Sequence, residues 1–221
     1  MKYTYFTPDK AYVVQFFNDP ANANDPKMQD RIKAIIGRYN PTIPEEEGGA
    51  NGNDVYTASY FAKRFCWPVA IVVKPEFGIV SPSYPKNFFF TANASQILKL
   101  EGKDKKSNWF TGKNRKYLNA SELGDFRTTL QMCILLSRSL RRMHQAGLAH
   151  SDLSFNNVLT DPKTGTCVII DIDSLVVPGL FPPEVIGTRG YVAPEVLQTL
   201  GMERSKRKYP GVQTDLHSMA V

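Results

Sequence analysis

The stretch His150-Ser151-Asp152-Leu153-Ser154-Phe155-Asn156-Asn157 decides the fold, because it places an Asp and an Asn five residues apart in a short polar loop. The β-branched run Val168-Ile169-Ile170 leads to a second acid, Asp171, 14 residues after Asn157. The segment Gly187-Thr188-Arg189-Gly190-Tyr191-Val192-Ala193-Pro194-Glu195 follows and ends 24 residues after Asp171. Asx residues alone are common turn formers, but three such elements in this order indicate a chemical site.

The order resembles the protein-kinase signature H-R-D-x-x-x-x-N, D-F-G and A-P-E. In a kinase-like site, Asp152 accepts or orients the proton of the attacking hydroxyl. Asn157 and Asp171 supply hard oxygen ligands for Mg²⁺, which bridges the ATP phosphates. We therefore expect ATP and Mg²⁺ as cofactors. Asp152, Asn157 and Asp171 are the expected catalytic residues, and the last two also bind metal and nucleotide.

The composition is that of an ordinary globular protein. The chain has 221 residues, of which 42% are hydrophobic and 22% charged, enough for one large domain or two small lobes. No apolar run reaches the length of a membrane span, and no signal peptide is visible at Met1-Lys2-Tyr3-Thr4-Tyr5-Phe6. The three cysteines follow no disulfide or zinc spacing, which predicts reduced thiols in a cytoplasmic protein without a membrane partner.

The net charge of +6 is concentrated in two clusters, 103–116 and 204–208. A basic cluster is a potential nucleic-acid site. No aromatic-basic repeat or known nucleic-acid motif accompanies these clusters, so solvated loops are the favoured interpretation and a nucleic-acid partner is not expected.

The pattern changes from β-rich to helical near Ser81-Pro82-Ser83-Tyr84-Pro85. Before this point, a hairpin is expected at residues 3–17, a helix over 25–38 and a strand pair over 69–80. A long helix over 126–145 follows, stopped by Gly147, and then two short strands near 158 and 167–170.

This layout predicts an α+β, bilobal kinase-like fold with a β-rich N-lobe (1–82) and an α-helical C-lobe (83–221). The adenine of ATP would lie on the joining segment, at Ser83 and Tyr84. Residues 214–221 resemble the start of the central C-lobe helix, and the N-terminus resembles the end of a glycine-rich loop. We therefore expect both ends to be truncated relative to a full kinase domain, the C-lobe stopping in its central helix.

The lysine that pairs with the nucleotide phosphates is absent from its usual strand. The segment matching V-A-I-K is Tyr12-Val13-Val14-Gln15, and Gln15 carries no charge. However, Lys2-Tyr3-Thr4-Tyr5 resembles the end of the glycine-rich loop in the with-no-lysine kinases, where the lysine comes from this position. Lys2 is either the replacement beside Gln15 or a flexible terminal residue. On the following helix, Gln29 or Asp30 stands where a Glu is expected.

Three further positions depart from the kinase pattern. Ser151 replaces an Arg that binds phosphorylated activation loops, and Ser154 replaces the catalytic-loop Lys. The D-F-G segment reads Asp171-Ile172-Asp173. Asp173 is either an additional metal ligand or a surface-facing acid that caps a turn, and the second interpretation is favoured.

The fuller resemblance is to an atypical bacterial serine/threonine kinase-like family found with tellurite-resistance and stress gene clusters. It rests on residues 5–10, Phe65-Cys66-Trp67-Pro68, the catalytic loop and Gly187-Thr188. It implies a protein substrate and a role beside a von Willebrand A-type protein and a PP2C-type phosphatase.

Three functions stay open at this point. The first is ATP-dependent phosphorylation of Ser or Thr in a protein. The second is a catalytically impaired, nucleotide-binding pseudokinase scaffold, which Gln15 and Ser154 favour. The third is a small-molecule kinase of the aminoglycoside-phosphotransferase type. The peptide-site segment 187–195 argues against this third function.

Overall fold

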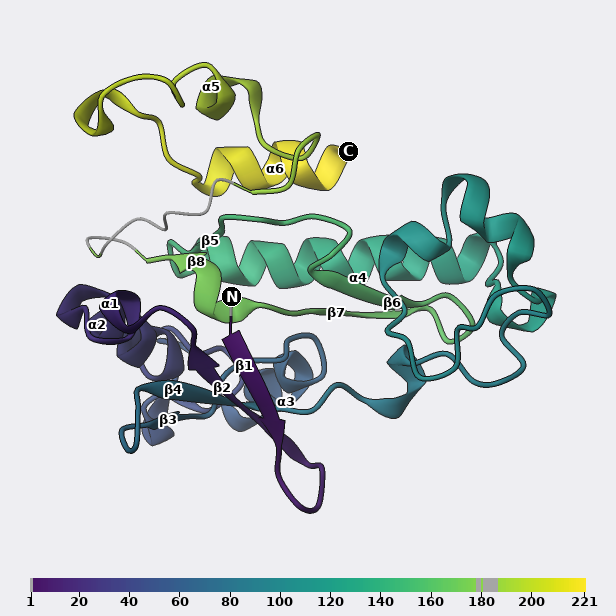
Figure 1. Cartoon of the computed structure of the whole chain (residues 1–221), viewed down its shortest axis with the longest axis horizontal. Coiled ribbons are helices and arrows are strands. Elements are labelled where there is room, and N and C mark those ends of the chain that lie inside the picture. Colours follow the sequence, from purple (N-terminus) through teal and green to yellow (C-terminus); the bar gives the residue numbers. More distant parts are fainter. Residues whose placement is uncertain (1, 178–179, 181–186) are drawn as a thin grey trace.

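The structure is a computed structural model that describes residues 2–177, 180 and 187–221 (Figure 1). A four-stranded antiparallel sheet occupies the N-terminal part, and the long helix α4 runs through the middle of the molecule. The C-terminal helices lie on the far side of α4 from the sheet (Figure 1). This mixed content fits the predicted α+β class.

The sheet has the strand order β1-β2-β4-β3. Its strands are β1 (Lys2–Phe6), β2 (Tyr12–Phe17), β3 (Ala70–Val72) and β4 (Gly78–Pro82). In the register, Lys2 lies opposite Phe17, and Gln15 lies opposite both Thr4 and Ile79. Because directly opposed residues project from the same face of a sheet and alternate along each strand, Lys2 and Gln15 share one face.

Helices α1 (Pro20–Ala23), α2 (Pro26–Ile36) and α3 (Val55–Ala62) connect β2 to β3. Helix α2 begins where the Asp25 side chain accepts a hydrogen bond from the Lys27 N–H, and it ends at Gly37. Its buried face carries Met28, Ile32 and Ile35, the spacing from which the helix is predicted. Helix α3 is not predicted from the sequence.

The C-terminal part is built on α4 (Phe126–Gln145), whose bounds match the predicted helix. Asp125 and Thr128 form a capping box at its start, and Gly147 follows its end with φ of 78°. The remaining elements are β5 (Ala149–His150), β6 (Val158–Asp161), β7 (Thr166–Ile169), β8 (Leu175–Val176), α5 (Pro194–Leu197) and α6 (Val212–Ala220). None of the described helices is both long and apolar enough to cross a membrane.

The segment between β4 and α4 differs from its prediction. The sequence predicts helical structure from residue 86 onward, whereas the helical segments between β4 and α4 are four short 3-10 helices. These are Lys86–Phe88, Ser107–Trp109, Gly112–Tyr117 and Ala120–Glu122. The segment has its own small core around Phe90, Leu100 and Phe110.

One hydrophobic core joins the sheet side to the α4 side. Ile32 and Ile35 of α2 pack in the same cluster as Met143 of α4 and Ile169 of β7. Trp67 lies in this cluster and its indole N–H donates to the Ile35 carbonyl at 2.8 Å. The predicted boundary after residue 82 coincides with the end of β4. The division into two lobes stays a prediction, because this core is continuous across that boundary.

Candidate functional site

The loop between β5 and β6 holds the Asp152 carboxylate in a fixed position. The Ser154 N–H donates to the Asp152 carbonyl and the Asn157 N–H donates to the Ser154 carbonyl, both at 3.0 Å. The Asn157 side-chain amide donates to the Asp152 carbonyl at 2.7 Å and to Oδ2 of its carboxylate at 3.1 Å. The five-residue spacing of Asp and Asn therefore closes the loop on itself.

The other carboxylate oxygen of Asp152 is bound by the segment that begins at Gly187. The Thr188 N–H donates to Asp152 Oδ1 at 2.7 Å, and the Thr188 hydroxyl donates to Ser154 Oγ at 3.0 Å. Gly187 has φ of +89°, and a Cβ there would lie 2.9 Å from the Ser151 carbonyl oxygen. Only glycine fits this approach without strain, so the sequence brings the two motifs together through a glycine.

A buried network below the loop fixes its start. Asp215 of α6 accepts from the His150 N–H at 2.8 Å and lies 3.0 Å from Nε2 of His144 in α4. Nδ1 of His150 accepts from the Asp152 N–H at 3.2 Å, so its Nε2 is the nitrogen that donates to the Ile170 carbonyl at 3.1 Å. Asp215 lies in the segment that resembles the start of the central C-lobe helix, but neither Asp215 nor His144 is a predicted site residue, because their partners are distant along the chain.

Asp171 follows β7 in an unusual backbone conformation. It has φ of 60° and ψ of 42°, the left-handed region that few non-glycine residues adopt. The Ile170 N–H donates to the Asn157 carbonyl at 3.0 Å, so Asp171 leaves the strand next to the catalytic loop. Burial, and then the neighbouring charge of Asp173, raise the pKa of Asp171, while Lys2 and His150 offset part of this effect.

Lys2 reaches this acid from the first strand of the sheet. Its ammonium lies 3.4 Å from Asp171 Oδ1, is in closer contact with Asp173 Oδ2, and sits 5.7 Å from the Phe17 ring centroid. Burial lowers the pKa of Lys2, but the charges of Asp173 and Asp171 outweigh it and the net shift is upward. Lys2 is thus ordered by contacts far along the chain.

The favoured interpretation of Asp173 as a surface-facing acid is wrong. Its side chain is buried and paired with Lys2, because the 3-10 turn Ile172–Ser174 directs it inward. The Ser151 hydroxyl donates to the Ser174 carbonyl at 2.9 Å and fixes this turn against the catalytic loop.

Helix α2 places the cation Arg31 near Asp173, whereas the kinase pattern has a Glu on this helix. Arg31 donates to the Leu175 carbonyl at 3.2 Å, and Asp173 is the first of the charges that raise its pKa against the larger lowering effect of burial. Asp30 pairs with Lys33 on the exposed side, and Gln29 donates to the Ala23 carbonyl at 2.8 Å. Neither Gln29 nor Asp30 contacts Lys2 in the described contacts.

Gln15, Ser83 and Tyr84 complete the predicted set. Gln15 shares the sheet face of Lys2, two residue pairs away in the register. The Ser83 N–H donates to the Ala11 carbonyl at 2.9 Å, and its buried hydroxyl has no hydrogen-bond partner among the described residues. Tyr84 packs beside Cys66 and Ile170. The structure thus gathers Asp152, Asn157, Asp171 and Lys2. Among the described residues no hydrogen bond or ion pair links Ser83 or Tyr84 to them, although the Asp171 charge contributes, after burial and Cys66, to the raised pKa of Tyr84.

Two of these residues fit a Mg²⁺ shared with phosphates. The described residues contain no group of three His, Cys, Asp or Glu side chains that could hold a metal alone. Mg²⁺ in phosphoryl-transfer sites needs only one or two carboxylates, because waters and substrate phosphates complete its shell. Asp171 offers a carboxylate with incompletely compensated charge, and the Asn157 amide nitrogen faces Asp152, which leaves its carbonyl oxygen available.

Comparison with known proteins agrees with the geometry. The family model described as "Protein kinase domain" matches residues 95–221, more than half of the 221-residue chain. The comparison with curated proteins gives no match. The matched part contains Asp152, Asn157, Asp171 and the segment from Gly187 to Glu195, and such a domain indicates kinase-type phosphoryl transfer. The chain belongs to the protein kinase family.

Proposed function

We propose that this chain is an ATP- and Mg²⁺-dependent serine/threonine protein kinase, which transfers the γ-phosphoryl group to a protein hydroxyl. The observation that carries the proposal is the Lys2 ammonium, 3.4 Å from the Asp171 carboxylate. It supplies a positive charge on the sheet face where Gln15 has none. A phosphate site without such a charge would favour the pseudokinase alternative.

Asp152 is the residue that would take the proton of the attacking hydroxyl. One carboxylate oxygen accepts from Thr188 and the other from Asn157, so the group is oriented before any substrate binds. When the hydroxyl oxygen bonds to the γ-phosphorus and the bond to ADP breaks, the hydroxyl proton passes to Asp152. General-base or orienting groups of this kind contribute about 10²–10⁴-fold in rate.

Asn157 and Asp171 would hold the metal between the catalytic loop and the nucleotide. When bound, Mg²⁺ would supply positive charge that offsets the negative charge developing on the leaving phosphates. Lys2 would orient the phosphates as a point charge, with Asp173 holding its ammonium in place. Ser83 and Tyr84 would line the adenine side, where the unpartnered Ser83 hydroxyl is free to bond a base edge.

The acceptor side supports a polypeptide substrate. Thr188 donates to the Asp152 carboxylate through its N–H and to Ser154 through its hydroxyl, and the centroids of the Phe155 and Tyr191 rings lie 5.8 Å apart. Small-molecule kinases of the aminoglycoside-phosphotransferase type lack this peptide-shaping segment, so we assign the hydroxyl to a protein.

The decisive experiment measures Mg·ATP binding by calorimetry and ATP-dependent labelling of Ser- and Thr-containing peptides. Asp152→Asn should lower kcat by about 10²–10⁴-fold with ATP affinity nearly unchanged. Lys163→Met, in the exposed turn between β6 and β7, is the matched control and should keep both. If the parent chain binds Mg·ATP without any turnover, the pseudokinase scaffold is the correct function. An absence of nucleotide binding would contradict both functions.

Three further predictions rest on the motifs. They are that the chain belongs to the tellurite-resistance-associated bacterial kinase-like family, that it acts in the cytoplasm, and that its partners are a von Willebrand A-type protein and a PP2C-type phosphatase. Pull-down of those two protein classes with the purified chain would test the partnership, and no enrichment over an unrelated kinase would contradict it.

A further inference from the structure

A group of arginines gathers where α3 lies against the C-terminal half of α4, away from the phosphoryl-transfer site. Arg138, Arg141 and Arg142 of α4 and Tyr60 of α3 line a hollow of about 330 Å³. The Arg64 guanidinium lies 5.1 Å from the centroid of the Tyr60 ring. The other lining residues, Gly52, Thr57, Phe61 and Gln145, include no acid.

These cations have no ionic partner in the part of the chain that the structure describes. Within residues 2–177, 180 and 187–221, no carboxylate lies within 4.0 Å of Arg64, Arg138, Arg141 or Arg142. Arg142 donates only to neutral oxygens, Asn53 Oδ1 at 3.2 Å and the Asn51 carbonyl at 3.3 Å. Burial lowers its pKa, and no acid compensates. The hollow is therefore lined by three arginine cations, and the carboxylates that bind its lining residues, Glu45 and Asp54, accept from the backbone N–H groups of Gly52 and Thr57.

Two buried guanidinium nitrogens at or near the hollow have no hydrogen-bond partner among the described residues. They are Nε of Arg142, which lines the hollow, and Nε of Arg64, which lies over the Tyr60 ring. Such atoms are uncommon in folded proteins, because a buried donor without a partner is destabilising. Burial raises the pKa of Tyr60, but side-chain hydrogen bonds from Arg138 and Arg64, together with their charges, outweigh it and the net shift is downward.

One of the lining arginines departs from an ordinary solvated face. Arg138 and Arg141 are exposed, as is Arg127 at the start of α4, and arginines on an exposed helix normally extend into water. Arg142 is instead half-buried, and its Nε has no hydrogen-bond partner among the described residues. A guanidinium presents a planar fork of donors that matches phosphate oxygens in pairs.

We propose that the hollow between α3 and α4 binds the phosphate of a phosphorylated serine or threonine side chain in a protein. Its volume, at the lower end of the range for ligand sites, suits one phosphorylated side chain. The adjoining first turn of α3 exposes Val55 and Tyr56, an apolar surface for the residues flanking the phosphate. A membrane surface would favour cations that extend from a flat face, whereas Arg142 is half-buried in the wall of the hollow.

The test uses the whole chain without nucleotide, so that the proposed ATP site stays empty. Calorimetry would compare a peptide library with central phosphoserine, its unphosphorylated counterpart, inorganic phosphate, and vesicles containing phosphatidylserine. We expect binding of the phosphopeptide, weak competition by inorganic phosphate, and no binding of the other two probes.

Arg138→Gln with Arg141→Gln removes two exposed cations from the hollow. We expect phosphopeptide affinity to fall by about 10- to 100-fold, the effect of losing a charged hydrogen bond. Arg115→Gln with Arg127→Gln removes the same charge elsewhere and should leave affinity unchanged. Equal weakening by both pairs, equal binding of the unphosphorylated peptides, or preferential vesicle binding would each overturn the proposal. Since Lys2→Met leaves the hollow intact, it should bind the phosphopeptide normally, which separates this test from the kinase proposal.

Discussion

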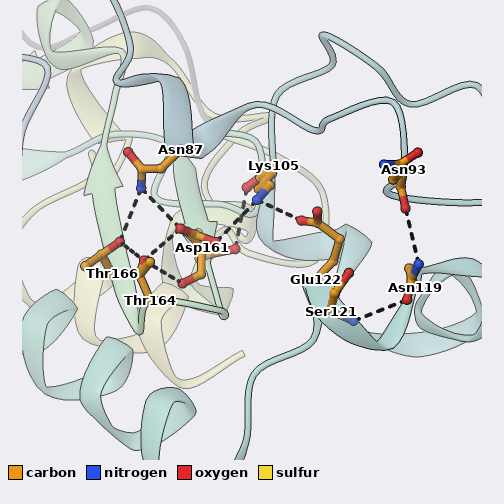
Figure 2. Close-up of polar contacts among 10 residues, drawn as sticks. Asn87, Asn93, Lys105, Asn119, Ser121, Glu122, Asp161, Thr164 and Thr166 are labelled. Atoms are coloured by element: carbon orange, nitrogen blue, oxygen red, sulfur yellow. Dashed lines mark hydrogen bonds and ion pairs between the residues drawn. The ribbon is translucent and has the colours of Figure 1, made fainter.

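Two lysines in this molecule each face two acids, but in different surroundings. The Lys105 ammonium lies 2.8 Å from Glu122 Oε2 and 3.3 Å from Asp161 Oδ1, with all three side chains at most 8% exposed. Figure 2 shows this cluster beside the β6–β7 hairpin, where Thr164 and Asn87 also donate to Asp161. Around Lys2, the Asp171 side chain is 44% exposed, while Asp173 is 8% exposed.

The difference shows how the same charges serve structure in one place and chemistry in another. The enclosed cluster is Lys105 with Glu122 and Asp161; each of these side chains has an oppositely charged partner within 3.3 Å and is shielded from solvent, and the cluster fixes the 3-10 segments before α4 to the hairpin. The open cluster is Lys2 with Asp171 and Asp173; it has the same one cation and two acids, but its Asp171 side chain is 44% exposed and has a raised pKa. An arriving cation can therefore reach a carboxylate of the open cluster but not one of the enclosed cluster.

The largest expected effect is on stability at the enclosed cluster. Lys105→Met leaves two buried carboxylates unpaired and should lower the free energy of unfolding by about 3–5 kcal/mol. Denaturant unfolding followed by circular dichroism measures this. Lys106→Met is the neighbouring control, because Lys106 pairs with Asp104 at 3.8 Å near the surface and should contribute about 1 kcal/mol or less. Similar losses for the two variants would mean that the clusters do not differ as described.

The next effect is on turnover at the open cluster. Lys2→Met should lower kcat by about 10²–10³-fold, the range for losing one preorganised charge donor. Its unfolding free energy should fall by only about 1 kcal/mol, because Asp171 is open to water and Arg31 still lies near Asp173. Gln15→Lys should restore part of the rate, since Gln15 occupies the same sheet face. A Lys2→Met variant with parental ATP affinity and turnover would favour the pseudokinase function.

A smaller contrast lies inside the open cluster itself. Asp171→Ala should weaken Mg·ATP binding much more than Asp173→Ala, because we assign metal binding to Asp171 and only the placement of Lys2 to Asp173. For Asp173→Ala we expect a loss of about tenfold, equivalent to one weakened charge contact. Calorimetric titration with Mg·ATP measures both variants, and equal losses would make Asp173 a metal ligand.

The enclosed and open clusters also differ in what the sequence reveals. Asp152, Asn157 and Asp171 could be predicted because their spacing along the chain carries the geometry, and helix α4 because its apolar periodicity and Gly147 define it. Lys105 lies in a run of basic residues that is typical of a solvated loop, and its partner Asp161 is 56 residues away. The inward orientation of Asp173 likewise depends on Lys2, whose pairing no local pattern encodes. Helix α3 was missed because it follows a loop rich in Gly and Asn.

The smallest expected effect concerns how far the solvent-accessible region around Lys2 and Asp171 extends. The reactivity of the cysteine thiols measures this extent. Cys66 packs beside Tyr84 on the proposed adenine side, and Cys167 lies in β7. Burial raises the pKa of both thiols to about 12, whereas Cys133 is exposed on α4.

Because the thiolate is the reactive form, iodoacetamide at pH 8 should modify Cys133 first and leave the other two largely unmodified. Mass spectrometry of the digested protein measures this, and Cys133→Ser should remove the fast phase. The stability of the folded chain should be unaffected, since Cys133 projects into solvent.

Fast modification of Cys66 would show that the opening extends from Asp171 to Tyr84, and the adenine side would then belong with the open cluster. If Cys66 reacts as slowly as Cys167, the opening is confined to Lys2 and Asp171, and an adenine ring must displace protein contacts to bind there.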